Sequence, residues 1–258
     1  MSFSTDTTLA KPLPSPNHGE RRDGRAPDCL ILHYTGMPTA EAALERLCDP
    51  SAEVSAHYAV LEDGAILQLV PEARRAWHAG VGRWKGEEDL NSASIGIEIV
   101  NQGHDAIIAG ASLPAYPDVQ IDSVIALCRD IASRHTIAPE RILAHSDIAP
   151  ARKRDPGEHF PWERLHASGI GHYVRPVPIS GGRFLARGEQ GQPVEALQAM
   201  LTLYGYGLEV TGIYDLATEQ VVAAFQRHFR QERVDGVADA STITTLRDLI
   251  KALPVTRG

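Results

Sequence analysis

Three short apolar segments that run into ionisable side chains constrain this chain most. The runs 29–32 and 142–144 are followed directly by His33 and His145, and a third segment, 95–100, alternates and carries Glu98 inside it. Continuous apolar runs of this length are typical of strands buried on both faces of a sheet. Polar groups held at the ends of such strands are well placed for metal or catalytic chemistry. The sequence therefore predicts a sheet with a polar site at one edge.

The segments around these strands predict an α/β domain. Apolar spacing predicts helices over about 40–47 and 117–135, and Asp63-Gly64 between two apolar runs predicts a hairpin with a tight type I′ turn. We expect a mixed central sheet flanked by helices over about residues 26–171. Residues 1–25 are poor in apolar residues and carry several Pro, Gly and Arg, which predicts an extended, poorly ordered arm.

The character of the sequence changes after residue 171. Pro and Gly residues indicate a linker over 172–182. After it, apolar residues recur at helical spacing in three segments, and Asp215 and Asp239 stand where they could cap the helices that follow them. We expect a small all-helical domain over 183–258. The residues alone are consistent with a packing or dimerisation module, since no cluster of ionisable groups suggests chemistry there.

Composition narrows the class of protein. The chain has 258 residues and a net charge of −8, which argues against nucleic-acid binding. Cys29, Cys48 and Cys128 are an odd count without a C-x-x-C pair, so we expect free thiols. We find no membrane-spanning run and no secretory signal, and therefore expect a cytoplasmic protein. A periplasmic protein with a trimmed N-terminus is the alternative.

The polar residues at the strand ends suggest a metal site. His33, His145 and Asp155 together are a complete protein ligand set for a catalytic zinc ion. The turn at Pro156-Gly157 could bring Asp155 back towards His145. With 11 histidines in the chain, a chance pairing or a charged surface loop is an open alternative.

Hydrolysis at such a site needs two further groups. Glu98 is the right type of residue to take a proton from water and return it to a leaving nitrogen. Lys153 could stabilise an oxyanion. The alternatives are a strand glutamate paired with an arginine, and a lysine that belongs to the solvated basic run 152–154.

Aromatic and polar residues near these segments could line a cleft. Tyr58 precedes an apolar stretch and could equally be a hydrogen-bonded core residue. Trp77 and His78 lie in a segment without regular spacing that could stack on a sugar or peptide, or be pinned to the core by its tryptophan.

Several motifs together resemble the type 2 family of zinc N-acetylmuramoyl-L-alanine amidases, which includes peptidoglycan recognition proteins. The resemblance covers about residues 26–165 and rests on Leu32-His33-Tyr34-Thr35, Ser55-Ala56-His57-Tyr58, Trp77-His78-Ala79-Gly80, Ser94-Ile95-Gly96-Ile97-Glu98, His145-Ser146-Asp147-Ile148-Ala149-Pro150 and Arg152-Lys153-Arg154-Asp155-Pro156-Gly157. Motifs such as Tyr204-Gly205-Tyr206 and Thr211-Gly212-Ile213-Tyr214-Asp215 resemble a helical peptidoglycan-binding domain. Together they are most similar to two-domain amidases that accept anhydro-muropeptides.

The resemblance implies roles for individual residues. It implies one Zn²⁺ per chain held by His33, His145 and Asp155. It implies Glu98 as general base and acid and Lys153 as the oxyanion-stabilising cation. Candidate substrate contacts are Tyr58, Trp77, His78 and Arg152.

The implied reaction is cleavage of the amide between N-acetylmuramic acid, or its 1,6-anhydro form, and L-alanine of the stem peptide. We expect muropeptide fragments as partners and a role in cell-wall recycling. An exported or phage-type amidase acting on polymeric wall, or a non-catalytic peptidoglycan-binding protein, are the alternatives.

Overall fold

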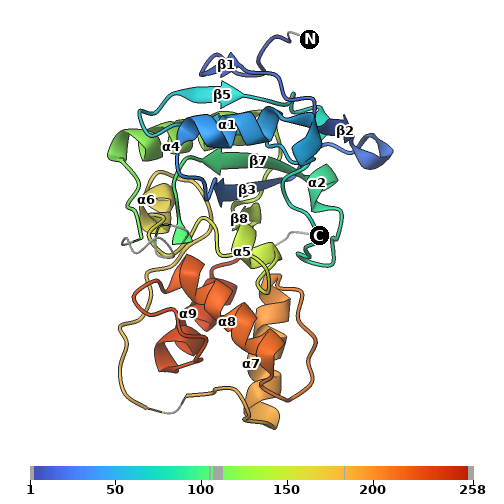
Figure 1. The fold of residues 1–258 in the computed structure, drawn as a ribbon. Coiled ribbons are helices and arrows are strands. Elements are labelled where there is room, and N and C mark those ends of the chain that lie inside the picture. The colour runs from blue at the N-terminus through green and yellow to red at the C-terminus, as the bar shows by residue number, and fades with distance from the viewer. Residues whose placement is uncertain (1–2, 105, 107–112, 183, 255–258) are drawn as a thin grey trace.

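The computed structural model describes residues 3–104, 106, 113–182 and 184–254. A six-stranded sheet with the order β1-β5-β4-β7-β3-β8 forms the centre of the N-terminal part (Figure 1). In that order the strands are Ala10–Pro12, Ile66–Gln68, Tyr58–Val60, Ser94–Ile99, Cys29–Tyr34 and Ile142–Ala144. Neighbouring strands are parallel except β4 and β5, which are antiparallel. The predicted mixed sheet is confirmed.

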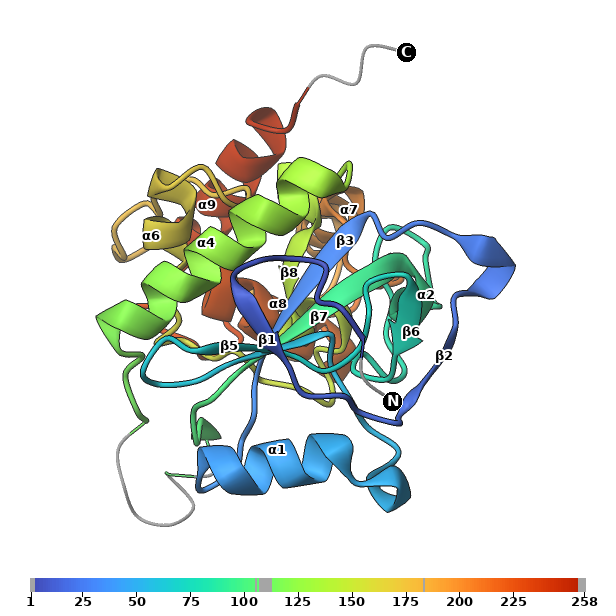
Figure 2. The same cartoon turned by 90° about the horizontal axis from the view of Figure 1, so that it is seen from above.

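Two helices cover opposite faces of this sheet (Figure 2). Helix α1 (Ala40–Cys48) packs with Ala59 of β4, whereas α4 (Asp118–Arg134) belongs to the cluster that contains Tyr58 and Val60. Successive side chains of a strand point to opposite faces, so this division follows from the alternation along β4. Thr39 caps α1 by accepting the amide of Ala42.

The hairpin β4–β5 exists, but its turn differs from the expected type I′. A type I′ turn needs positive φ at two residues. Here only Gly64 has a positive φ, of 84°, while Leu61 and Ala65 close the loop with a hydrogen bond of 2.9 Å. The Gly64 amide also donates to the Leu61 carbonyl. The connection is therefore a three-residue loop in which glycine supplies the left-handed position.

The N-terminal arm is extended, as expected, but it is part of the fold. Strand β1 pairs with β5, and β2 (His18–Glu20) pairs with β6 (Arg74–Ala76). The Asp6 carboxylate accepts hydrogen bonds from Gln68 and from the Glu72 amide. The expectation of poor order was wrong because main-chain pairing and polar side chains hold this segment although it has few apolar residues.

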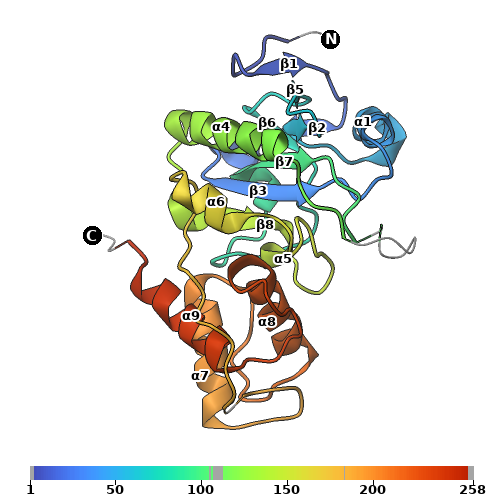
Figure 3. The same cartoon turned by 90° about the vertical axis from the view of Figure 1, so that its left-hand side faces the viewer.

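The C-terminal helices pack beneath β8 and α5 (Figures 1 and 3). They are α7 (Gln192–Tyr204), α8 (Leu216–Phe229) and α9 (Ala240–Lys251), and Asp215 and Asp239 cap the last two as predicted. One continuous apolar cluster includes residues of both the sheet and these helices. The expected domain limits at 183 and 258 lie outside the described residues.

Short elements complete the described chain. They are η1 (Arg22–Gly24), η2 (Pro50–Ala52), α2 (Leu90–Ala93), η3 (Pro139–Arg141), α5 (His145–Ile148) and α6 (Trp162–Ala167). All three cysteines are free. Within the described ranges, no helix is both long and apolar enough to cross a membrane.

Candidate metal centre

Strand register brings the polar residues of three segments together. His33 lies opposite Glu98 in the parallel pair β3–β7. Leu32 lies opposite Ala144 in the pair β3–β8, so His145 follows at the next register position. His145 is the first residue of the one-turn helix α5, which follows β8 directly. The sheet therefore sets the positions of His33, Glu98 and His145.

Three side-chain atoms form a small triangle at this edge. His33 Nδ1 lies 2.8 Å from His145 Nδ1 and 3.1 Å from Asp155 Oδ2, and the third side, from His145 Nδ1 to Asp155 Oδ2, is 2.9 Å. All three residues are buried. Two ligands of a tetrahedral zinc ion are about 3.3 Å apart. The triangle is close to the size that such an ion requires.

The proton positions on His33 follow from a chain of contacts that ends at a carbonyl. Ser94 Oγ lies 2.5 Å from the Leu90 carbonyl, which can only accept, so the hydroxyl donates to it. Ser94 then accepts from His78 Nε2 at 3.3 Å, and His78 Nδ1 accepts from His33 Nε2 at 3.0 Å. This arrangement leaves the lone pair of His33 Nδ1 facing the triangle.

A second carbonyl orients His145. Its Nε2 lies 3.0 Å from the Ala79 carbonyl and must carry the proton, so the lone pair of Nδ1 also faces the triangle. Arg152 Nη2 donates to the same carbonyl at 2.9 Å and also holds the Val81 carbonyl. Ligating histidines commonly have their second nitrogen fixed in this way.

The charges at the triangle also suit a cation. Burial, followed by the nearby His145, lowers the pKa of His33 to about 4. Burial opposes ionisation of Asp155, but His145 and His33 outweigh it and hold the pKa of Asp155 well below its usual range. A neutral histidine and an ionised carboxylate are the forms that bind metal. Three lone pairs converging without a proton between them would repel one another unless a cation lay among them.

Glu98 and Lys153 lie in the cavity beside the triangle. The cavity has a volume of about 520 Å³ and both side chains line it, together with His145 and Asp155. Burial, followed by the charge of Asp155, raises the pKa of Glu98 well above its usual range, against the opposing charge of Lys153. Glu98 Oε2 is buried and has no hydrogen-bond partner among the described residues. Such an atom is available to a substrate or water.

The structure gives Tyr58 a different position from the expected substrate contact. The side chain is fully buried, and its hydroxyl donates to Glu72 at 2.6 Å. Glu72 also binds Arg134 and His135. Because Tyr58 sits on the face covered by α4, opposite the face that carries Glu98, its role is structural.

The other three expected contacts line the cavity. Trp77 is half-buried there, and its amide donates to Ser55. His78 is buried behind His33 and hydrogen-bonds to it, which indicates that it orients the His33 ring. Arg152 has an exposed side chain whose guanidinium holds the segment 79–81.

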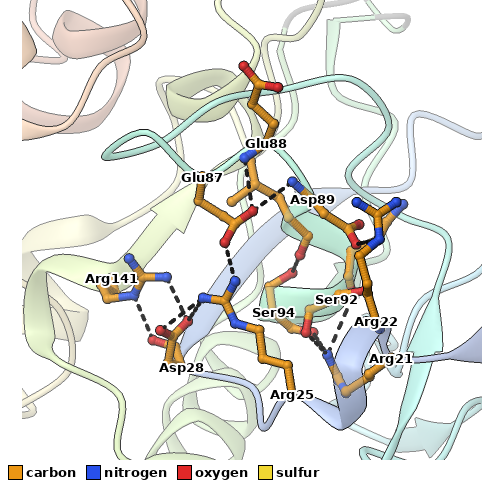
Figure 4. Close-up of polar contacts among 12 residues, drawn as sticks. Arg21, Arg22, Arg25, Asp28, Glu87, Glu88, Asp89, Ser92, Ser94 and Arg141 are labelled. Carbon is orange, nitrogen blue, oxygen red and sulfur yellow. Dashed lines mark hydrogen bonds and ion pairs between the residues drawn. The ribbon is translucent and has the colours of Figure 1, made fainter.

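A network of arginines and carboxylates surrounds the start of β7, where Ser94 contacts His78 (Figure 4). The buried Arg21 donates to the carbonyls of Ser92 and Ser94, at the start of β7. Arg25 joins Asp28 to Glu87, and Arg141 also binds Asp28. The network anchors the strand that carries Glu98.

Sequence reasoning missed several residues around the centre. Arg46 and Arg154 line the cavity, and neither has a hydrogen bond or ion pair within the described part of the chain. Asp147 is fully buried and accepts the Ala144 amide at 2.8 Å. Its position three residues after Ala144, the N-cap of α5, is the only signal that could have identified it, as half of a capping box.

Comparison with known proteins supplies relatives for both parts of the chain. Residues 23–158 match the family described as N-acetylmuramoyl-L-alanine amidase, and residues 190–246 match the family described as putative peptidoglycan binding domain. The N-acetylmuramoyl-L-alanine amidase AmiD of Escherichia coli is 38% identical over 221 residues, which are 83% of this chain and 78% of AmiD. The 1,6-anhydro-N-acetylmuramyl-L-alanine amidase AmpD of Enterobacter cloacae is 34% identical over 61% of this chain and 89% of AmpD.

Solved structures of two amidases are similar to this chain over most of its length. The complex of E. coli AmiD with the substrate anhydro-N-acetylmuramic acid-L-Ala-D-γ-Glu-L-Lys has a TM-score of 0.74 at 35% identity, covering 88% of this chain and 90% of AmiD. AmpDh3 from Pseudomonas aeruginosa has a TM-score of 0.73 at 29% identity, covering 97% of this chain and 98% of AmpDh3.

Proposed function

This chain belongs to the N-acetylmuramoyl-L-alanine amidase family, and from that premise we propose that it cleaves the amide between muramic acid and L-alanine of muropeptides. The substrate class includes the 1,6-anhydro sugar, because AmiD and AmpDh3 have been solved with anhydromuramic peptides. The observation that carries the proposal is the triangle of His33, His145 and Asp155 next to the unpartnered Glu98 Oε2.

The metal we propose is Zn²⁺, held by His33 Nδ1, His145 Nδ1 and Asp155 Oδ2. Two imidazoles and one carboxylate suit zinc and leave a position open. When bound, the ion supplies a Lewis acid and lowers the pKa of water. The hydrogen bonds from His33 to His78 and from His145 to the Ala79 carbonyl keep the lone pairs of both Nδ1 atoms directed at the centre of the triangle, where the ion would lie.

The proposed reaction uses two side chains of the cavity. Glu98 removes a proton from the attacking water and delivers it to the nitrogen of L-alanine as the amide breaks. Its raised pKa suits both steps, since the carboxyl must hold the proton before returning it. Lys153 stabilises the negative charge that develops on the amide oxygen.

We propose that the cationic side chains lining the cavity bind the carboxylates of the stem peptide. The chain is acidic overall, with a net charge of −8, yet the cavity is lined by Arg46, Arg152, Lys153 and Arg154. The Arg152 guanidinium already donates hydrogen bonds to the carbonyls of Ala79 and Val81. Arg46 and Arg154 are therefore the candidates for direct contact with the stem peptide. Trp77 would stack on the sugar or peptide.

We assign the amide chemistry to about residues 26–171, joined by the linker 172–182 to the helical region 183–258. We also propose that the protein recycles soluble fragments in the cytoplasm, with no nucleic-acid partner. The three free cysteines support a reducing compartment. A periplasmic amidase acting on polymeric wall is the competing proposal, and the match of residues 190–246 to a peptidoglycan-binding family favours it.

One experiment tests the activity and the substrate together. The purified protein, loaded with one equivalent of Zn²⁺, is incubated with a soluble anhydro-muropeptide and with intact sacculi, and released peptide is measured. We expect turnover of the soluble substrate, loss of turnover in Glu98→Gln, and wild-type turnover in Glu163→Gln, an exposed glutamate on α6. Turnover of sacculi alone would support the wall hydrolase, and turnover undiminished in Glu98→Gln would refute the assigned base. Cell fractionation tests the compartment.

A further inference from the structure

A buried carboxylate joins the helix that carries His145 to the C-terminal helices. Asp147 lies in α5 and is fully buried. Its Oδ2 accepts the Ala144 amide at 2.8 Å and His228 Nδ1 at 2.7 Å, and its Oδ1 accepts the Tyr206 hydroxyl at 2.7 Å. One side chain thus receives a donor from the end of β8, directly before its own helix, and two donors from the C-terminal region. The proposed reaction uses none of these groups.

Packing between the two regions fixes both donors. The His228 ring, on α8, stacks on Trp162 at 3.7 Å between centroids and 24° between planes. The Tyr206 ring packs edge-on against Trp84 at 5.0 Å. Gly205 allows this approach, because a Cβ there would lie 2.5 Å from the Trp84 ring. The hydroxyl and the imidazole therefore reach Asp147 from rigid positions.

Helix α5 connects these contacts to the metal centre. It has four residues, too few to be stable without external contacts. It begins with His145, and the Ser146 amide donates to the Asp155 carbonyl at 3.0 Å. Two of the three ligand residues are therefore tied to α5, so a displacement of α5 would move both of them.

We propose that Tyr206 and His228 are positioning residues, and that the C-terminal helices hold the metal ligands in place through Asp147. This role is separate from any part that these helices have in binding peptidoglycan, and it rests on the proposed metal centre. Loss of either donor leaves a buried carboxylate oxygen without one of its partners. The helix then relaxes to recover a partner, and the ligand triangle loosens.

The test compares two buried tyrosines from the same segment in the full-length protein. Tyr206→Phe removes the donor to Asp147, whereas Tyr204→Phe removes a hydroxyl that hydrogen-bonds to His172 instead. His228→Phe keeps a ring to stack on Trp162 but removes the other donor. His228→Asn restores an N–H near the position of Nδ1. Circular dichroism confirms that each variant is folded.

Two readouts report on the metal centre independently of turnover. The first is zinc affinity, measured by competition with a chromophoric chelator. The second is the visible absorption of the Co²⁺-substituted protein, which depends on ligand geometry. We expect about 10-fold weaker zinc binding and an altered Co²⁺ spectrum in Tyr206→Phe and His228→Phe, at the lower end of the 10–100-fold range for residues that support ligands. Tyr204→Phe should bind zinc as the wild type does, and His228→Asn should recover most of the affinity lost in His228→Phe.

The outcomes separate this inference from the proposed function. Zinc binding by the wild type, with Tyr206→Phe and His228→Phe equal to Tyr204→Phe in affinity and Co²⁺ spectrum, would overturn the positioning role alone. Failure of the wild type to bind zinc would overturn the metal centre itself and, with it, this inference.

Discussion

A single methyl group added at Gly96 should disturb the proposed metal centre without touching His33, His145 or Asp155. Gly96 lies in the middle of β7, and a Cβ there would be 2.4 Å from Cγ and 2.5 Å from Nδ1 of the buried His78 ring. Contacts this short do not occur, and Gly96 has no positive φ that would strain alanine. The His78 ring must therefore move.

The size of the effect follows from the contacts that His78 would lose. The ring makes the hydrogen bond of 3.0 Å that orients His33. Loss of such a supporting partner weakens metal binding about 10–100-fold, or about 1.4–2.8 kcal/mol. Overpacking of the core adds about 1–3 kcal/mol of destabilisation to the metal-free protein.

Gly19→Ala is the matched control, because a Cβ there meets only Trp77 Nε1 at 3.9 Å. Zinc affinity is measured by chelator competition, and stability by urea unfolding of the metal-free proteins. We expect weaker binding and lower stability in Gly96→Ala only. Zinc binding by Gly96→Ala within twofold of both the wild type and Gly19→Ala would refute the role of His78 in orienting His33.

Further predictions concern the reaction, the metal, the substrate and pH. Glu98→Gln should retain zinc and lower kcat about 10²–10⁴-fold, as single-turnover rates and metal analysis would show. Chelation should abolish activity and lower the melting temperature, and zinc at 100 times its Kd should restore about 2.7 kcal/mol. Arg46→Ala should raise KM more than it lowers kcat for a stem peptide with free carboxylates; an unchanged KM would contradict the contact. Burial opposes ionisation of Glu158, but His104 and Arg227 outweigh it and lower the pKa of Glu158 to about 2 from 4.5. The stability from this lowered pKa is therefore present above pH 4.5 and lost as pH falls towards 2. Urea unfolding should find that the free energies of unfolding of the wild type and Glu158→Gln differ by at most about 3 kcal/mol above pH 4.5 and converge towards pH 2.

Much of the fold was predictable because it depends on local pattern. The apolar runs before His33 and His145 identified two neighbouring strands, and helical periodicity identified α4 and the three C-terminal helices. The aspartates that cap α8 and α9 were recognisable from their residue type and position. The convergence of His33, Glu98 and His145 could be anticipated because parallel strands end at the same edge of a sheet.

The rest depends on register and on long-range contacts, which the sequence does not encode locally. Alternation along β4 places Ala59 on the face covered by α1 and Tyr58 on the face covered by α4. The prediction that Tyr58 contacts substrate was wrong because the sequence does not show which of these two neighbours faces the cavity. His78 could not be placed behind His33 without knowing that Gly96 leaves room for its ring. Asp147 looked like one more polar residue in a charged stretch, because its partners Tyr206 and His228 come from a distant segment.

The N-terminal strand has a consequence for how this protein could be shortened. The amidase match begins at residue 23, beyond β1 and β2. A chain cut there would leave the outer edge of β5 unpaired, and an unpaired edge can template association with other chains. It would also lose the bonds from Ser15 to the Leu47 carbonyl and from Asn17 to the Asp49 carbonyl, which hold the end of α1. The segment 10–20 thus covers the edge of β5 and holds α1, whose residues line one wall of the cavity beside Glu98.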